Sequence, residues 1–240
     1  MKVNILNMAF DNYTKAEFIE KFENRIHQQE KTLVVTANPE IVMYAKDNPK
    51  YKTLLSNEAD YITADGIGVV KAGEILKTPI KERVTGYDLF LDLLNMANQK
   101  HLSIYLIGAK QEIIELAVKR VREEYPNISL AGYRNGYFDL DDQTVQQAII
   151  DKAPDMVFAA LGFPRQEYFL ADLKHKLNKG YLMGIGGSFD VFSGITKRAP
   201  VWMQDLHLEW FYRLLKEPTR FKRMLVLPKF IQEVKRVGKR

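Results

Sequence analysis

Residues 156–162 read MVFAALG, and residues 103–108 read SIYLIG. Both runs are apolar at nearly every position, so a strand formed by either one would present apolar side chains on both of its faces. Strands of that kind are typical of a parallel sheet that is covered by helices on each side. The two runs therefore predict buried strands in such a sheet.

Similar runs recur along most of the chain, separated by longer amphipathic segments. The runs predict strands at residues 3–6, 32–36, 61–63, 103–107, 128–131, 156–160 and 181–185. The segments between them predict helices near residues 15–29, 39–46, 67–76, 87–99, 111–124, 142–152 and 165–177. This alternation predicts an α/β fold, with a largely parallel, Rossmann-like sheet and helices on both faces.

The alternation stops at Lys197. The remainder is basic and rich in aromatic residues, and Pro200, Pro218 and Pro228 divide it into helical pieces. We therefore expect an α/β domain over residues 1–196 and a helical appendage over residues 197–240, with no flexible linker between them.

The basic character of the chain is confined to its end. Residues 213–240 carry ten Lys or Arg and two Glu, a charge of +8; the whole chain has 35 basic and 30 acidic residues, so the body is at −3. A segment that is both basic and apolar suits an anionic membrane surface. The same charge would also suit the phosphate backbone of a nucleic acid, which is a second hypothesis from the residues alone.

The absence of Cys excludes a disulfide framework, thiolate catalysis and thiolate metal sites. It fits a reducing compartment, and the N-terminus has no pattern of a secretory signal, so the cytoplasm is the default. No stretch approaches the roughly 20 apolar residues that a spanning helix needs. Any membrane contact should therefore be peripheral.

In an open α/β sheet the ligand usually lies beyond the carboxyl ends of the strands. Asn38 follows one predicted strand and precedes Pro39, which suits a helix cap, although a cap can also contact a ligand. Asp65 ends another strand, before Gly66. Sequence position alone favours a helix cap for Asp65 over a general base at the mouth of a cleft.

Three features of the sequence that follows stay ambiguous. Residues 66–68 form only part of a GxGxxG fingerprint, so a dinucleotide-dependent oxidoreductase is a weak third hypothesis. Arg83 could bind a phosphate or form a surface ion pair. Gly108 opens a helix that could receive an anion, but close packing of helix and strand would require the same small residue.

The stretch LGFPRQE brings Gly162, Arg165 and Gln166 to the start of a helix, where donors can converge on a ligand. After the last predicted strand, Gly186 and Gly187 form a loop able to wrap phosphate or sugar, and Asp190 follows. The four His residues show no metal-ligand spacing, so we expect neither a metal ion nor a cofactor.

Together these motifs resemble a known family. TANPEIV, ADGIGVV, RVTGYDL, LGFPRQE, GGSFDVFSG, KRAPVW and LEWFYRLLKEPTRFKR occur in this order and at these spacings. The chain resembles the WecG/TagA/CpsF glycosyltransferase family from about Asn4 to Arg223, and within it the members that act in wall teichoic acid synthesis.

The resemblance implies an enzyme that moves N-acetylmannosamine from its UDP donor to the 4-hydroxyl of N-acetylglucosamine on undecaprenyl diphosphate. An α-linked donor and a β-linked product would mean inversion, which needs one base on the acceptor hydroxyl. A related member of the family with another sugar donor is the alternative. Catalysis would be independent of a metal ion, and no nucleic acid would be a partner.

The resemblance also implies roles for particular residues. Asp65 matches the proposed base, Thr36 and Asn38 match polar groups near the reacting sugar, and Arg83 and Gln166 match the same pocket. The substrate would be held by Gly66, Gly108, Gly162, Arg165, Gly186, Gly187 and Asp190. In the appendage, Arg213, Arg220 and Arg223 would reach over the donor diphosphate.

The end of the chain then has two expected tasks, closing the active site and holding it at the inner face of the cell membrane. One apolar face contains Phe221, Met224 and Leu225, and a stripe continues through Phe230, Val234 and Val237. Such a helix can lie among lipid headgroups. Alternatively, the stripe packs on the body or on a second subunit, which would make the protein a homo-oligomer.

Overall fold

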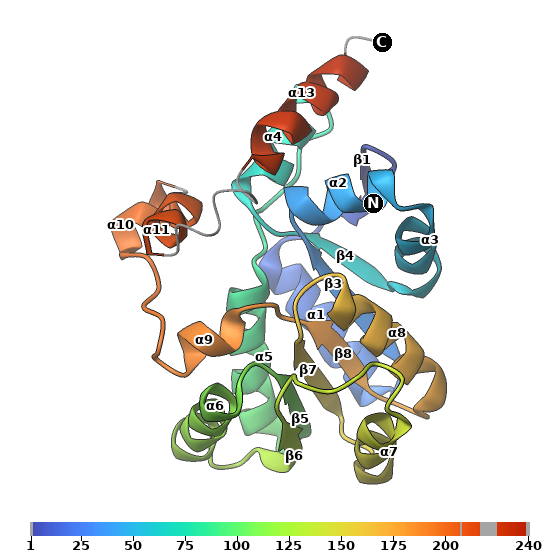
Figure 1. Cartoon of the computed structure of the whole chain (residues 1–240), viewed down its shortest axis with the longest axis vertical. Helices are drawn as coiled ribbons and strands as arrows, with labels where there is room; N and C mark the ends of the chain where they lie inside the picture. The colour runs from blue at the N-terminus through green and yellow to red at the C-terminus, as the bar shows by residue number, and fades with distance from the viewer. Residues whose placement is uncertain (1, 207, 217–224, 239–240) are drawn as a thin grey trace.

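The computed structural model describes residues 2–206, 208–216 and 225–238. Its centre is a sheet of six parallel strands in the order β4-β3-β8-β7-β5-β6 (Figure 1). The strands are β3 (Thr32–Ala37), β4 (Tyr61–Ala64), β5 (Ser103–Gly108), β6 (Ser129–Arg134), β7 (Met156–Ala160) and β8 (Tyr181–Gly184). The predicted α/β fold with a parallel sheet is confirmed.

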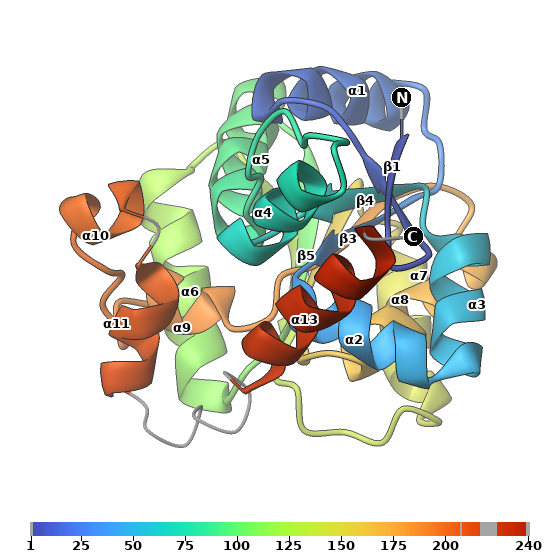
Figure 2. The same cartoon turned by 90° about the horizontal axis from the view of Figure 1, so that it is seen from above.

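Helices cover both faces of the sheet. One face packs on α1 (Lys15–His27), α5 (Gly86–Lys100), α6 (Gln111–Glu124) and α9 (Ser188–Phe192). The other packs on α2 (Pro39–Asp47), α3 (Pro49–Glu58), α4 (Ile67–Ile75), α7 (Gln143–Lys152) and α8 (Arg165–Lys176). The view from above shows α1 and α5 on one side of the strands and α2, α3 and α8 on the other (Figure 2).

Strand β7 shows why the two-faced apolar run predicts this architecture. Phe158 points into the core with α5 and α9, whereas Val157 and Ala159 point into the core with α8. All five residues of the strand are buried. Both faces of the strand therefore remove apolar surface from water, which is the main favourable contribution to folding.

The N-terminal strand departs from the prediction. β1 (Lys2–Ile5) does not join the main sheet but pairs antiparallel with β2 (Met8–Asp11), a strand that the sequence did not predict. The turn between them places Leu6 and Asn7 at positive φ. The hairpin is tied to the sheet by the Asp11 carboxylate, which accepts a hydrogen bond from the Ile62 backbone N–H at 2.9 Å.

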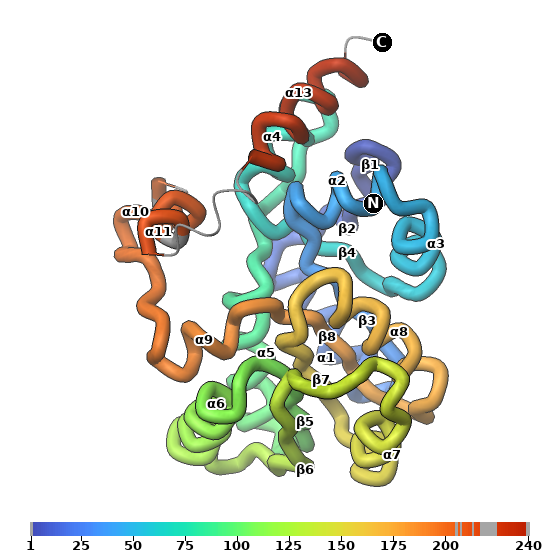
Figure 3. The backbone as a smooth tube through the Cα atoms, viewed as in Figure 1, coloured from blue at the N-terminus to red at the C-terminus, as the bar shows by residue number. Residues whose placement is uncertain are grey.

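Beyond Lys197 the described residues are helical, as predicted. Within this described part, the helices that follow α9 are α10 (Val201–Asp205), α11 (Glu209–Lys216) and α13 (Val226–Gly238). Helices α10 and α11 lie apart from the sheet, above α9 in this view, whereas α13 lies next to α4 and α2 (Figure 3). Pro228 does not separate two helices, because it lies in the first turn of α13, where a missing N–H is tolerated.

The apolar stripe of α13 packs on the body. Phe230 and Val234 are fully buried in the core shared with α2 and α4. Gly68 of α4 permits a close approach of α13, since a Cβ on Gly68 would lie 2.7 Å from the Leu227 side chain. Of the stripe, Val237 is 44% exposed. Phe221 and Met224 lie outside the described residues.

None of the helices that the structure describes is long and apolar enough to cross a bilayer.

Candidate active site

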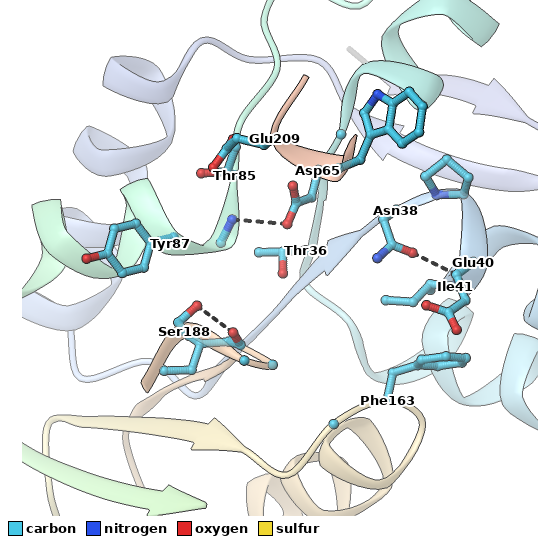
Figure 4. A pocket seen from close by; sticks show the side chains of 18 of the residues that line it. Thr36, Asn38, Glu40, Ile41, Asp65, Thr85, Tyr87, Phe163, Ser188 and Glu209 are labelled. Carbon is cyan, nitrogen blue, oxygen red and sulfur yellow. Dashed lines mark hydrogen bonds between the residues drawn. The ribbon is translucent and has the colours of Figure 1, made fainter. Parts of the chain in front are cut away.

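A cavity of about 550 Å³ opens at the carboxyl ends of four neighbouring strands, β4, β3, β8 and β7. The parallel register aligns Ala37 of β3 with Ala64 of β4, so Asn38 and Asp65, the residues near these two strand ends, reach the same rim. Figure 4 shows the side chains of Thr36, Asn38 and Asp65 around this space.

Asn38 caps a helix and also lies in the lining of the cavity. Its side-chain oxygen accepts a hydrogen bond from the Ile41 N–H at 3.0 Å and caps α2, with Pro39 at the first helical position. It also lines the cavity. The cap holds the side chain by its oxygen, so the orientation of its NH₂ group toward the cavity is fixed.

Asp65 does not cap the helix that follows it. The N-cap of α4 is Gly66, which has a φ of 103° and makes no side-chain cap bond. The Asp65 carboxylate instead accepts a hydrogen bond from the Gly86 N–H, at the first turn of α5, at 3.3 Å. The partial positive charge of a helix N-terminus stabilises an ionised carboxylate there.

Thr36 is the polar residue at the end of β3. Its hydroxyl donates to the Gly184 carbonyl of β8 at 3.4 Å. A Cβ on Gly86 would lie 2.9 Å from the Thr36 oxygen, so the glycine in VTGYDL lets α5 begin directly against this side chain. The start of α5 therefore positions both Thr36 and Asp65.

Gln166 joins the opposite wall to the glycine loop. Its side-chain oxygen accepts a hydrogen bond from the Gly186 N–H at 3.1 Å, and its nitrogen donates to Glu167 at 2.8 Å. Gly162 and Gly186 both have positive φ, 73° and 51°, and a Cβ added at either residue would have no atom within 4 Å. Backbone conformation, not crowding, requires glycine at these two places.

Arg83 lines the cavity and is paired with the appendage. Its guanidinium donates to Glu209 of α11 at 3.1 Å, and the other oxygen of Glu209 accepts from Arg198 at 3.3 Å. Arg198 also pairs with Asp88 of α5 at 2.8 Å. These four side chains are mostly shielded from solvent and attach α11 to the rim of the cavity.

The cavity wall is acidic. Among the described residues that line it, Arg83 is the only basic one, whereas the acidic ones are Glu40, Asp65, Asp190 and Glu209. A diphosphate would need further cations to offset its charge. The predicted arginines Arg220 and Arg223 lie outside the described residues, and only the backbone of Arg213 is described.

The structure brings most of the predicted site residues together. The cavity is lined by Thr36, Asn38, Asp65, Gly66, Arg83, Gly162, Gln166, Gly186, Gly187 and Asp190. Two predicted residues, Gly108 and Arg165, are not in this lining. Gly108 packs against Ala160, whose backbone a Cβ would approach to 2.4 Å, and Arg165 donates to the carbonyls of Gly136 and Phe138.

Residues from the appendage complete the wall and were not predicted as site residues. Glu209 and Trp210 come from α11, and Val226 and Leu227 come from α13. The motif LEWFYR contains two of them, but nothing in its spacing indicates that it contacts Arg83 at the rim of the cavity. Their role depends on contacts between residues more than 100 positions apart, such as Arg83 with Glu209.

A polar cavity at the carboxyl ends of adjoining parallel strands is where α/β enzymes bind small ligands. The fold and the cavity thus define an α/β ligand-binding protein. Residues 3–240 match the model of the glycosyl transferase WecG/TagA/CpsF family, so the chain belongs to that family, as the sequence motifs predicted.

Named relatives cover almost the whole chain. An N-acetylglucosaminyldiphosphoundecaprenol N-acetyl-beta-D-mannosaminyltransferase of Bacillus spizizenii is 44% identical over 96% of this chain and 89% of its own length. A protein of the same name from Bacillus subtilis is 44% identical over 94% of this chain and 88% of its own. A protein of that name from Staphylococcus aureus strain MW2 is 40% identical over 97% of this chain and 92% of its own length.

Proposed function

We propose that this protein transfers N-acetylmannosamine from UDP-N-acetylmannosamine to N-acetylglucosaminyl-diphospho-undecaprenol, a step of wall teichoic acid synthesis. Relatives that carry the name of this activity align with it almost from end to end. The observation that supports it most strongly is the convergence of Asp65, Thr36, Asn38 and Gln166 on one cavity of a family glycosyltransferase.

In the proposed reaction, Asp65 removes the proton from the 4-hydroxyl of the acceptor sugar as the oxygen attacks the anomeric carbon of the donor. The bond from that carbon to UDP breaks on the opposite side, so the configuration inverts and the product is β-linked. Asp65 suits a base because it lies at the cavity rim, and its hydrogen bond with Gly86 fixes its orientation.

The leaving diphosphate would be bound by the glycine loops at Gly162 and Gly186 and by arginines. Arg83 lines the cavity, and the wall is otherwise acidic among the described lining residues. We propose that Arg213, Arg220 and Arg223 supply the remaining positive charge from the appendage, which takes the role of a metal ion. Transfer should therefore continue in the presence of EDTA.

Binding to UDP tests the nucleotide part of the proposal. A ligand present at about 100 times its dissociation constant stabilises the native state by roughly 2.7 kcal/mol, which corresponds to a rise in Tm of about 5–10 °C for a chain of this size. We expect UDP to produce this rise and NAD to produce none. A rise with NAD alone would instead favour a dinucleotide-dependent oxidoreductase.

The acceptor is a lipid, and the appendage carries exposed apolar side chains that could meet it. They occur on α10, at its C-cap and on α11: Val201, Trp202, Leu206, Phe211 and Leu215. Exposed Trp and Phe are typical of segments that bind at the membrane interface. We propose that this surface, and not the buried stripe of α13, contacts the inner face of the cell membrane.

Fluorescence can test this contact, since the only two Trp residues of the chain are Trp202 and Trp210, both in the appendage. We expect anionic vesicles to shift their emission to shorter wavelength. Replacing Trp202 by Ser should weaken vesicle binding by about 10- to 150-fold, because burying a large apolar side chain contributes roughly 1.5–3 kcal/mol. Trp210 remains as the reporter in this variant.

The matched control is Tyr137→Ser, which removes another exposed aromatic side chain, 71% exposed, from a loop before α7. It should bind vesicles like the wild type. Equal weakening by both substitutions would show that the α10–α11 surface is not the membrane contact.

A further inference from the structure

The cavity residue Gln166 has a neighbour with an unusual environment. Glu167 follows it in the first turn of α8, and its side chain is almost completely buried. Its Oε1 accepts a hydrogen bond from the Gln166 Nε2 at 2.8 Å. The Gln166 Oε1 accepts from the Gly186 N–H at 3.1 Å, so a continuous chain of hydrogen bonds runs from Glu167 to the glycine loop.

The two bonds of Gln166 define which way its amide faces. The Gly186 N–H can only donate, so it requires the amide oxygen. An ionised carboxylate can only accept, so Glu167 requires the amide nitrogen. One orientation of the amide meets both requirements, with its oxygen toward Gly186 and its nitrogen toward Glu167. Glu167 demands the nitrogen strictly only while its carboxyl group is ionised.

The Gln166 amide lies close to the backbone of β8. A Cβ on Gly184 would lie 2.5 Å from the Gln166 nitrogen, so the side chain is packed directly against the end of β8. The last strand and the glycine loop therefore both depend on where this amide lies.

The far side of Glu167 is closed by aromatic residues. Glu167 Oε2 and the Tyr51 hydroxyl of α3 are both buried, and neither makes a hydrogen bond with any described residue. Tyr51 is held by the rings of Tyr44 of α2 and Tyr168 of α8, at 5.1 and 5.8 Å between centroids. Among the described residues, the titratable side chains in this aromatic group are these three tyrosines.

This enclosure affects the charge of Glu167. Burial raises the pKa of its carboxyl to about 7, although the hydrogen bond from Gln166 favours the ionised form. The group therefore gains or loses its proton near neutral pH, at a point two hydrogen bonds away from the cavity loop.

We propose that Glu167 is a positioning residue whose ionised carboxyl fixes the orientation of Gln166 and, through it, the Gly186 loop of the substrate cavity, and that protonation of Glu167 releases both. The link to sugar transfer rests on the proposed function, but the link from Glu167 to Gly186 does not.

The first test is therefore independent of activity. In the full chain labelled with ¹⁵N, we expect the amide resonance of Gly186 to shift between pH 5.5 and 8.5 with a midpoint near the pKa of Glu167, about 7. Glu167→Gln should abolish this titration.

Asp172→Asn is the matched control. Asp172 also lies on α8 and also accepts a hydrogen bond from a glutamine, Gln146, at 2.8 Å, but neither residue lines the cavity. This variant should keep the Gly186 titration of the wild type.

The second test compares pH profiles of transfer. With a midpoint of 7, Glu167 is ionised in about one molecule in eleven at pH 6. The ionisation of Glu167 should therefore make kcat/KM of the wild type fall about tenfold from pH 8 to pH 6. Glu167→Gln should lose this fall, while Asp172→Asn keeps it. A merely structural role would lower activity by the same factor at every pH.

The proposal is overturned if the Gly186 resonance does not titrate in the wild type, or titrates unchanged in Glu167→Gln. It is also overturned if the pH profiles of the wild type and Glu167→Gln are parallel. If the wild type transfers no sugar at all, the proposed function fails, and the Gly186 titration still decides the role of Glu167.

Discussion

Replacing Asp65 by Asn is expected to lower the rate of sugar transfer by about 10²–10⁴-fold, the usual contribution of a general base. An amide oxygen can still accept the hydrogen bond from the Gly86 N–H, so the strand end and the start of α5 should keep their geometry. UDP should therefore raise the Tm of the variant as it does that of the wild type. Acceptor-dependent UDP release measures the rate.

Asp155→Asn provides the matched control. Asp155 also accepts a backbone N–H, that of Ser103 at 2.8 Å, but it lies at the amino ends of β5 and β7, away from the cavity. Its substitution should leave the rate of transfer nearly unchanged. Full activity in Asp65→Asn would remove Asp65 from the role of base.

Replacing Phe230 by Ala is expected to detach α13 from the body. Phe230 is fully buried, and truncation of a buried Phe to Ala costs about 3–5 kcal/mol. Only Phe230 and Val234 of this helix are buried. Loss of the Phe230 ring therefore removes a large share of the free energy that holds α13 on the body. Hydrogen exchange of the α13 amides should accelerate by at least about a hundredfold.

Transfer should fall in the same variant, because Val226 and Leu227 at the start of α13 line the cavity. Val237→Ala is the control on the same helix, since Val237 is partly exposed and its truncation should change neither exchange nor transfer. Normal transfer by Phe230→Ala with α13 detached would show that this helix is not part of the active site.

The sequence predicts the sheet well because its signals are local. The runs at 103–108 and 156–162 are apolar on both faces, and only a strand between two helical layers buries both. Asn38 with Pro39 likewise predicts the start of α2 from neighbouring residues alone. The helix of residues 49–58 was not predicted, since its apolar positions are few and its start follows the end of α2 directly.

The site was less predictable because its geometry depends on distant contacts. Position favoured a helix cap for Asp65, but its partner is Gly86, which lies 21 residues away. The apolar stripe of α13 suited a membrane as well as a protein core. Only the packing of α13 against α2 and α4 shows that Phe230 belongs to the core. No local pattern identifies Glu209 as the partner of Arg83 and Arg198.

The central claim is that the cavity transfers one N-acetylmannosamine residue with inversion to a lipid-linked acceptor. Its most direct test incubates the protein with UDP-N-acetylmannosamine and N-acetylglucosaminyl-diphospho-undecaprenol and determines the mass and anomeric configuration of the lipid product. We expect a gain of one N-acetylhexosamine residue in a β-linkage, and far slower transfer from UDP-N-acetylglucosamine. Release of UDP with no gain in the mass of the lipid, or an α-linked product, would contradict the claim.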